Sequence, residues 1–187
     1  MSGGKTKLPA HEIPAVPFEI VYELPPSIHR KIGKVVSAHA FLEYNVLELL
    51  CDLSQVDYPI GRVILRYQAA SERFKTIRRL LILRGIKTSF NLKNIFERIE
   101  QSCKKRDMFA HGVWVATKTG SDLALAVTRG EYEIEGGVAD RSFVPQSSTF
   151  SSEYCENTKN ESIELAHTVR NLRDEIVSIL EAQTAKS

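Results

Sequence analysis

An arginine and a histidine five positions apart, Arg106 and His111, are the residues of this chain whose types and spacing could do chemistry. A histidine can move a proton near neutral pH, and an arginine can hold a charged phosphate in a transition state. Such a pair needs no metal to cleave RNA, because RNA supplies its own nucleophile, the 2′-OH. The pair therefore predicts cleavage of RNA and not of DNA, although the bare spacing arises by chance about once in a chain of this size.

Helix geometry places a condition on this pair. Side chains five positions apart on an ideal helix point about 140° apart. Arg106 and His111 can therefore face one cleft only if the helix unwinds at residues 110–112, or if a second subunit completes the site. Lys104, Lys105, Arg106 and even His111 also suit the C-terminal end of a helix, because cations there interact favourably with the helix dipole. On that alternative reading they serve the dipole alone.

Four amphipathic helices are predicted to position this segment, each with apolar residues at steps of three and four. The predicted ranges are 27–53, 57–85, 89–112 and 158–180. Ser89 is expected to cap the third helix, and Thr158 with Glu161 forms a capping box for the fourth. The third helix then carries Arg106 and His111 to its C-terminal end.

The remaining segments differ in composition from these helices. Residues 1–26 contain five prolines and are predicted to form an extended arm. The stretch of about 113–152 is β-rich, and its first part predicts a hairpin with its turn at 119–121. We therefore expect a mainly α protein with a single domain over 27–187. Its predicted architecture is a four-helix up-and-down bundle with a small β-hairpin or sheet insertion before the last helix.

Positive charge is concentrated in residues 73–106. This range holds 11 basic and 2 acidic residues, a net charge of +9, which leaves −7 for the rest of a chain whose total is +2. A basic face of this kind suits a polyanion such as RNA, or else it is a solvated surface balanced by acidic neighbours. The candidates for RNA contact are Arg73, Arg78, Arg79, Lys104 and Lys105.

Several functional classes lack their signatures in this sequence. There is no GxGxxG, P-loop, HExxH, GxSxG or EF-hand pattern. The three cysteines lie about fifty residues apart and predict neither a disulfide framework nor a zinc site, which favours a reducing, cytoplasmic compartment. Prolines interrupt the N-terminal residues, so neither a signal peptide nor a membrane span is expected. No metal or cofactor is predicted.

Two further features are interpreted as structural in preference to functional. His39 and Glu43 lie four apart on the first helix and hence on one face; we interpret them as a partly buried polar pair satisfied locally, in preference to a functional site. Trp114 is the only tryptophan. It is expected to pack in a core or hairpin, in preference to stacking on a base.

The segment from Arg106 to Gly112, RDMFAHG, resembles the R-[N/D/H]-x-x-x-H motif of the HEPN superfamily, including the small residue before the histidine and the glycine after it. The resemblance extends to architecture over about residues 27–184. HEPN domains are helical bundles with two long antiparallel helices before the motif and a further helix after it. The first predicted helix, with FLE at 41–43 followed by three leucines, also looks like the leading helix of this group.

This resemblance implies a homodimer in which the two motifs meet across the interface. It implies a metal-independent endoribonuclease that leaves a 2′,3′-cyclic phosphate, of a toxin, defence or stress-response type, with an antitoxin or inhibitor protein as a further partner. Residue by residue, it makes Arg106 the phosphate-binding arginine, Asp107 the residue that positions it and His111 the catalytic histidine. The family also includes members that bind nucleic acid or nucleotides without cutting.

Two alternatives stay open on the sequence. The first is a non-catalytic helical module that binds nucleic acid, nucleotide or a partner protein through the basic face. The second is a purely structural dimerisation domain, which predicts neither binding nor cleavage.

Overall fold

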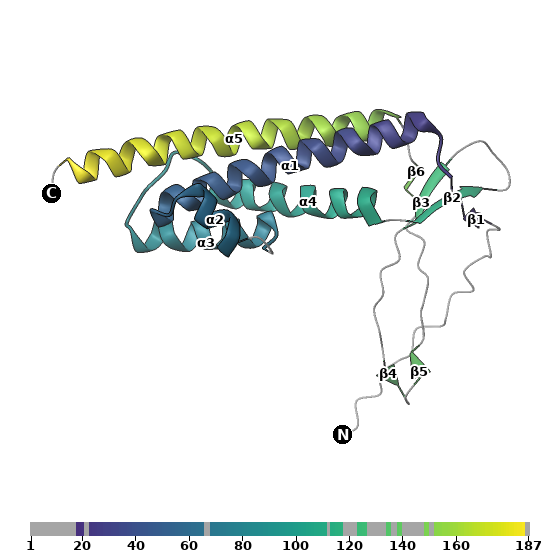
Figure 1. The fold of residues 1–187 in the computed structure, drawn as a ribbon, viewed down its shortest axis with the longest axis horizontal. Helices are drawn as coiled ribbons and strands as arrows, with labels where there is room; N and C mark the ends of the chain where they lie inside the picture. Colours follow the sequence, from purple (N-terminus) through teal and green to yellow (C-terminus); the bar gives the residue numbers. More distant parts are fainter. Residues whose placement is uncertain are drawn as a thin grey trace, which may run out of the picture.

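The computed structural model describes residues 18–20, 23–65, 68–111, 113–117, 123–126, 134–135, 138–139, 148–149 and 152–185. The prediction of a mainly helical protein is confirmed. Five helices account for most of the described residues: α1 (Pro26–Ser54), α2 (Tyr58–Ile64), α3 (Ala70–Leu83), α4 (Leu92–His111) and α5 (Ser152–Thr184). In Figure 1, α1 and α5 lie side by side and run in the same direction, while α4 runs the opposite way beneath them.

The helix α1 begins one residue earlier than predicted, because Pro26 occupies its first position, where a missing N–H costs no hydrogen bond. The helix ends at Ser54, and the capping residue Gln55 adopts a left-handed conformation with φ of 55° and returns its N–H to the carbonyl of Asp52. Nearly every turn of α1 buries at least one apolar side chain. This helix is therefore the central element of the fold.

The single long helix predicted over 57–85 is wrong in one respect, because two helices occupy this range. α2 ends at Ile64, and Ala69 is extended with ψ of 156° before α3 begins. α2 lies close against α1: a Cβ added at Gly61 would sit 2.3 Å from the sulfur of Cys51. Only glycine fits this contact without displacing the sulfur.

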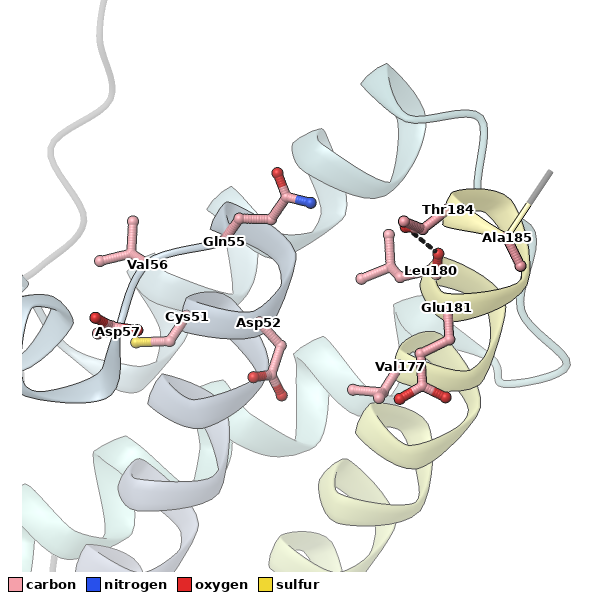
Figure 2. Close-up of a pocket in the computed structure, with 10 residues that line it drawn as sticks. All are labelled: Cys51, Asp52, Gln55, Val56, Asp57, Val177, Leu180, Glu181, Thr184 and Ala185. Carbon is pink, nitrogen blue, oxygen red and sulfur yellow. Dashed lines mark hydrogen bonds between the residues drawn. The ribbon is translucent and has the colours of Figure 1, made fainter. Parts of the chain in front are cut away.

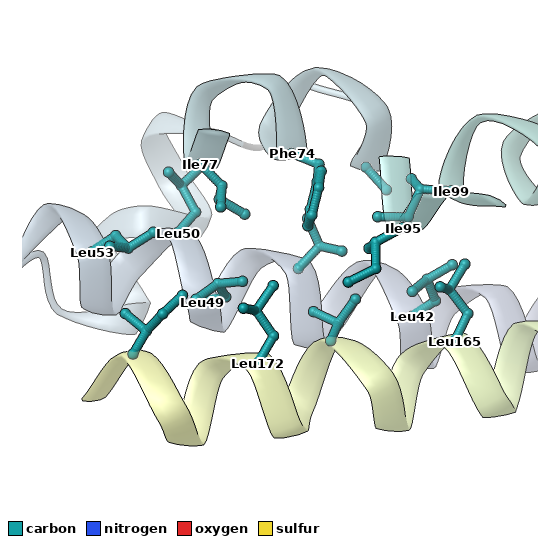
Figure 3. Close-up of a cluster of buried hydrophobic side chains, with 14 of the residues drawn as sticks. Leu42, Leu49, Leu50, Leu53, Phe74, Ile77, Ile95, Ile99, Leu165 and Leu172 are labelled. Carbon is teal, nitrogen blue, oxygen red and sulfur yellow. The ribbon is translucent and has the colours of Figure 1, made fainter. Parts of the chain in front are cut away.

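The break changes the helix order. In Figure 3, Ile77 of α3 lies beside Leu50 and Leu53 of α1, whereas Phe74 lies toward Leu42. α3 therefore runs in the same direction as α1. A strict up-and-down order of four long helices would have made these two antiparallel, so that part of the prediction is wrong.

Two predicted helix starts are also wrong, and the structure gives the reason for each. Asn91 caps α4, since its side chain accepts the N–H of Asn94 at 3.1 Å, whereas Ser89 binds the carboxylate of Glu175. Thr158 lies inside α5, which begins at Ser152, and its hydroxyl donates back to the carbonyl of Tyr154 at 2.8 Å. Local cap signals are thus overridden by tertiary contacts and by helix extension.

The main hydrophobic core lies between α1, α3, α4 and α5 (Figure 3). Its fully buried side chains come from all four helices and include Leu49, Phe74, Ile99 and Leu172, each with no exposed area. Burial of a large apolar side chain of this kind stabilises a protein by about 1.5–3 kcal/mol. One continuous core therefore holds the long helices in fixed positions relative to one another.

A second, smaller cluster lies where α4 meets the sheet. It joins Ile28 and Val35 of α1, Phe109 of α4, Trp114 of the following strand and Cys155 of α5. Trp114 is 7% exposed, so the prediction that it packs in a core is confirmed. This cluster holds the C-terminal turn of α4 against the start of α1 and of α5.

The described strands form two small sheets. The first has the order β1-β2-β3-β6, with β1 (Phe18–Ile20), β2 (Val113–Thr117), β3 (Leu123–Ala126) and β6 (Ser148–Thr149). Its neighbouring strands are antiparallel. The second pairs β4 (Ile134–Glu135) with β5 (Val138–Ala139). Part of the predicted N-terminal arm is therefore a strand, while residues 1–17 and the turn at 119–121 lie outside the described residues.

Candidate functional site around Arg106 and His111

The last two turns of α4 carry the residues whose spacing predicted chemistry. Arg106 is about a quarter exposed, and its guanidinium reaches across to α1. Its Nη2 lies 3.3 Å from Oε1 of Glu43, and its Nη1 lies 3.1 Å from Oδ1 of Asp107. The guanidinium therefore already lies between two carboxylates. Its Nε is buried and makes no hydrogen bond to any residue that the structure describes.

His111 is the last residue of α4 and is exposed to solvent. Residue 112, which follows it, lies outside the described part of the chain. No hydrogen bond or ion pair among the described residues joins His111 to Arg106. Their five-residue spacing on one continuous helix keeps the two side chains on different faces. Within one chain, the structure thus brings Arg106 to Glu43 and does not bring it to His111.

Next to Arg106 lies a buried polar chain that crosses from α1 to α5. His39 of α1 is 1% exposed, and its Nδ1 lies 2.9 Å from Oγ of Ser102 on α4. Ser102 in turn lies 3.0 Å from Oγ of Ser162 on α5, and that hydroxyl donates to the carbonyl of Thr158 at 3.0 Å. Three helices are therefore linked through one row of hydrogen bonds inside the bundle.

The other nitrogen of His39 faces a carboxylate. Nε2 lies 3.3 Å from Oε1 of Glu43, an ion-pair distance, although its N–H is not aligned for a hydrogen bond. The same oxygen, Oε1, is the one that contacts Arg106. Glu43 is thus shared between a buried imidazole and a half-buried guanidinium. The three residues form a continuous path of charge from the core to the surface of α4.

The environment shifts the pKa of both His39 and Glu43. Burial would lower the pKa of His39, but the neighbouring Cys103 thiol and Glu43 carboxylate outweigh it and raise the pKa above its ordinary 6.5. The contact with His39 lowers the pKa of Glu43 against the effect of burial, and the charges of Arg106 and Arg73 act in the same direction. The pair therefore favours an imidazolium beside a carboxylate.

This charge state argues against a nucleophilic serine. Ser102, His39 and Glu43 have the composition of a serine–histidine–carboxylate triad, in which the histidine must accept the serine proton. A charged His39 can only donate from Nδ1, so the hydroxyl of Ser102 accepts this hydrogen bond and donates its own O–H to Ser162. A serine with this arrangement is not activated. We interpret the row as a structural link that fixes the ring of His39.

The other predicted contact residues differ in accessibility. Arg73 is 7% exposed and donates from Nη2 to the carbonyl of Leu65 at 3.0 Å, so it does not belong to an exposed basic face. Lys105 pairs with Glu161 of α5. Arg78 is half-buried with its guanidinium 5.5 Å from the ring centre of Phe96. The exposed members of the predicted set are Arg79 and Lys104.

Two open pockets lie near these helices. The larger, of about 720 Å³, is at the far end of the bundle between the C-terminal turns of α1 and α5, where Asp52, Gln55, Leu180 and Glu181 line it (Figure 2). The second, of about 530 Å³, lies between α4 and α5, and Ser102 with Ser162 forms part of its wall. The first pocket is remote from Arg106 and His111 and has no part in the candidate site.

Sequence reasoning found part of this constellation. It paired His39 with Glu43 by their spacing, and the structure confirms that they lie together, but the pair is not satisfied locally because both side chains reach α4. Ser102 and Ser162 were missed. Isolated serines in amphipathic helices give no signal of a shared hydrogen bond, since their meeting depends on how the helices pack.

Comparisons with known proteins add no identification: no family model, no curated protein and no solved structure matches the chain. None of the described helices has both the length and the apolar character needed to cross a membrane. Within the described ranges, no group of three or more histidine, cysteine, aspartate or glutamate side chains is arranged to hold a metal ion. Any function must therefore be argued from the site itself.

Proposed function

We propose that the protein is a HEPN-like, metal-independent endoribonuclease that acts as a homodimer. The observation that carries the proposal is that the guanidinium of Arg106 lies at the boundary between α4 and α1 while His111 is exposed on the last turn of α4. α1 is a long helix before the motif, α4 carries the motif and runs antiparallel to α1, and α5 follows it, which supports a helical bundle of this general kind. The second long helix that the resemblance implies before the motif is divided into α2 and α3.

In the proposed reaction, His111 takes the proton of the RNA 2′-OH and returns it to the leaving 5′ oxygen. The 2′ oxygen forms a bond to phosphorus as the bond to the 5′ oxygen breaks, which yields a 2′,3′-cyclic phosphate and a 5′-OH. Arg106 stabilises the charge on the phosphate oxygens, and Asp107 holds its guanidinium at 3.1 Å.

A second chain is part of this proposal for a geometric reason. Arg106 and His111 lie on different faces of one helix, so one chain alone does not direct both side chains to one phosphate. A two-fold dimer that brings two α4 C-termini together would supply His111 from one copy and Arg106 from the other. An antitoxin or inhibitor protein that covers this end of the bundle fits the same proposal.

The test uses purified protein with single-stranded RNA in the presence of a chelator. We expect cleavage by the wild type and a loss of about 10²–10⁴-fold in rate in His111→Ala. His167→Ala is the matched control, because His167 is also exposed but lies on α5 against Phe41. Equal rates in the wild type and His111→Ala would refute the proposal, and so would a wild type that cleaves no RNA, alone or after removal of a co-purifying inhibitor.

One observation favours a second function, that of a non-catalytic binding module. The guanidinium of Arg106 already has two carboxylates beside it, as is usual for a structural arginine. The exposed cations Arg79 and Lys104 would then bind nucleic acid, nucleotide or an acidic partner without chemistry. Binding that weakens steeply with salt, persists in His111→Ala and occurs without cleavage would establish the module.

A further inference from the structure

The residue that links the buried core to the candidate site is Glu43. Its Oε1 lies 3.3 Å from Nε2 of His39 and 3.3 Å from Nη2 of Arg106. The carboxylate is about one-third exposed, His39 is fully buried, and Arg106 is about a quarter exposed. One oxygen atom therefore serves both cations. Any change in the charge of one cation must alter how firmly the carboxylate holds the other.

We propose that Glu43 is a positioning residue that holds Arg106 in reserve, and that the proton on His39 controls how readily Arg106 is released to an RNA phosphate. This inference rests on the proposed function, in which Arg106 is the phosphate-binding residue. It extends the candidate site beyond the motif on α4, because it includes Glu43 of α1 and the proton of the buried His39.

The physical reason is competition for one carboxylate. When His39 is charged, the imidazolium shares the negative charge of Glu43, and the guanidinium is held more weakly. A phosphate can then replace Glu43 as the partner of Arg106. When His39 is neutral, Glu43 and Asp107 together hold the guanidinium, and the phosphate must displace a stronger partner. RNA affinity should therefore fall as pH rises through the pKa of His39.

Several groups face His39 from the helices packed around it. Glu43 lies on its own helix and Cys103 comes from α4, while Arg106 of α4 and the charge of Arg73 on α3 act on Glu43. From α5 the hydroxyl of Ser162 reaches His39 through Ser102. The serine row leaves the imidazole little freedom to rotate, so its Nε2 stays beside Glu43 in both protonation states.

A purely structural ion pair would behave differently. It would make Glu43→Gln less stable, but RNA affinity would carry no dependence on the proton of His39. Coupling between two binding events is reciprocal, so an RNA that binds better to the charged His39 must also raise the pKa of His39. That reciprocity gives a measurement that stability alone cannot imitate.

The first experiment measures binding in the His111→Ala background, which removes the proposed catalytic histidine. The probe is a ten-nucleotide 2′-O-methyl oligouridine, which lacks the nucleophile for cleavage. We expect affinity at constant ionic strength to be about 5-fold tighter at pH 5.5 than at pH 8. His39→Gln and Glu43→Gln should each abolish this difference. Glu48→Gln should keep it, since Glu48 lies on α1 and pairs with Arg173 of α5.

The second experiment needs no RNA. NMR titration of the histidine side chains, with His39 assigned from His39→Gln, should show that Glu43→Gln lowers the pKa of His39 by about one unit. Arg106→Gln should raise it, because Glu43 is then left to His39 alone, and Arg106→Lys should move it less. Glu48→Gln should leave it unchanged.

The outcomes separate the two proposals. If no variant binds or cleaves RNA but Arg106→Gln still raises the pKa of His39, the coupling exists and the ribonuclease proposal fails. If RNA is cleaved but Arg106→Gln and Glu43→Gln leave the pKa of His39 in place, the positioning role is wrong. An unchanged pH dependence of binding in both His39→Gln and Glu43→Gln would also overturn it.

Discussion

Two arginines in this molecule each lie between two carboxylates, and they differ in how they are held. Arg173 of α5 donates from Nε to Asp52 at 2.5 Å and from Nη1 to Glu48 at 2.9 Å, and both partners lie on adjacent turns of α1. Arg106 of α4 reaches α1 with a single contact of 3.3 Å to Glu43, and its other partner is its own neighbour in the chain.

This difference in contacts indicates which role each arginine is suited to. The short bonds of Arg173 are charge-assisted and link α1 to α5, and its pKa is raised first of all by the bond to Asp52. Arg106 makes longer contacts, and its buried Nε has no hydrogen bond to any described residue. Arg173 is therefore suited to hold two helices together, and Arg106 is suited to exchange one anionic partner for another.

The largest expected effect separates the two arginines by activity. If the proposed ribonuclease function holds, we expect Arg106→Ala to lower the rate of RNA cleavage by about 10²–10³-fold, because it removes the group proposed to stabilise transition-state charge. Arg173→Ala should keep the wild-type rate at temperatures where it is folded. Cleavage of labelled single-stranded RNA in chelator measures both. A similar loss in both variants would show that the comparison does not separate function from structure.

Stability should separate them in the opposite order. Arg173→Ala leaves Asp52 and Glu48 without their charge-assisted bonds, and we expect it to lower the free energy of unfolding by about 1–3 kcal/mol. Arg106→Ala removes a looser contact and should cost less than about 1 kcal/mol. Urea denaturation followed by circular dichroism gives both values. If Arg106→Ala is the more damaging variant, Arg106 has a structural role.

The pH dependence of stability should show whether Glu43, the partner of Arg106, also titrates together with His39. Because the pKa of Glu43 is lowered in the folded protein, Glu43 contributes stability that is present above pH 4.5 and is lost as the pH falls through its folded pKa. Because the pKa of His39 is raised, His39 contributes stability that is present below pH 6.5 and is lost as the pH rises through its folded pKa. The free energy of unfolding of the wild type should therefore exceed that of Glu43→Gln by the largest margin, about 0.5–1 kcal/mol, between about pH 4.5 and 6.5.

Unfolding of the two proteins across pH 3.5–9 checks this window. Glu48→Gln is the control, because it tests a glutamate on the same helix that has no histidine partner among the described residues. A constant difference across the range would mean that His39 and Glu43 do not titrate as a pair.

The smallest expected effect concerns the surface beside each arginine. Lys104 is exposed two residues before Arg106, and Arg170 is exposed three residues before Arg173. We expect Lys104→Ala to weaken RNA binding a few-fold and to reduce its salt slope by about one. Arg170→Ala should change neither. Fluorescence anisotropy at several salt concentrations measures this, and equal effects would place RNA on both faces.

Features of the fold that depend on residues close together in the sequence were predictable, whereas features that depend on tertiary packing were not. The extent of α1 follows from apolar spacing, because a helix buried on one stripe must repeat its apolar residues at that period. The break before α3 was not predicted, since Ile64 and Phe74 both fit helical spacing. The extended backbone at Ala69 is set by packing of α2 and α3 on α1 and not by a local breaker residue.

The candidate site shows the same limit. Arg106 and His111 were recognisable because their order and their place at a helix end are local properties. The contact between Glu43 and Arg106 spans 63 positions and depends on the register of α4 against α1, which no short pattern encodes. His39 was correctly paired with Glu43, yet its burial and its bond to Ser102 belong to the packing of three helices.

The strand β1 has a consequence for how the protein should be handled. Because Phe18–Ile20 pairs with β2, the strand that follows the C-terminal end of α4 is an interior strand of its sheet. A chain trimmed to begin at residue 21 would turn β2 into an edge and expose its free amides and carbonyls to other molecules. Shortened versions made to remove the proline-rich arm would therefore tend to self-associate. An apparent dimer seen only in such a version would reflect strand pairing and not the dimer proposed to bring two α4 C-termini together.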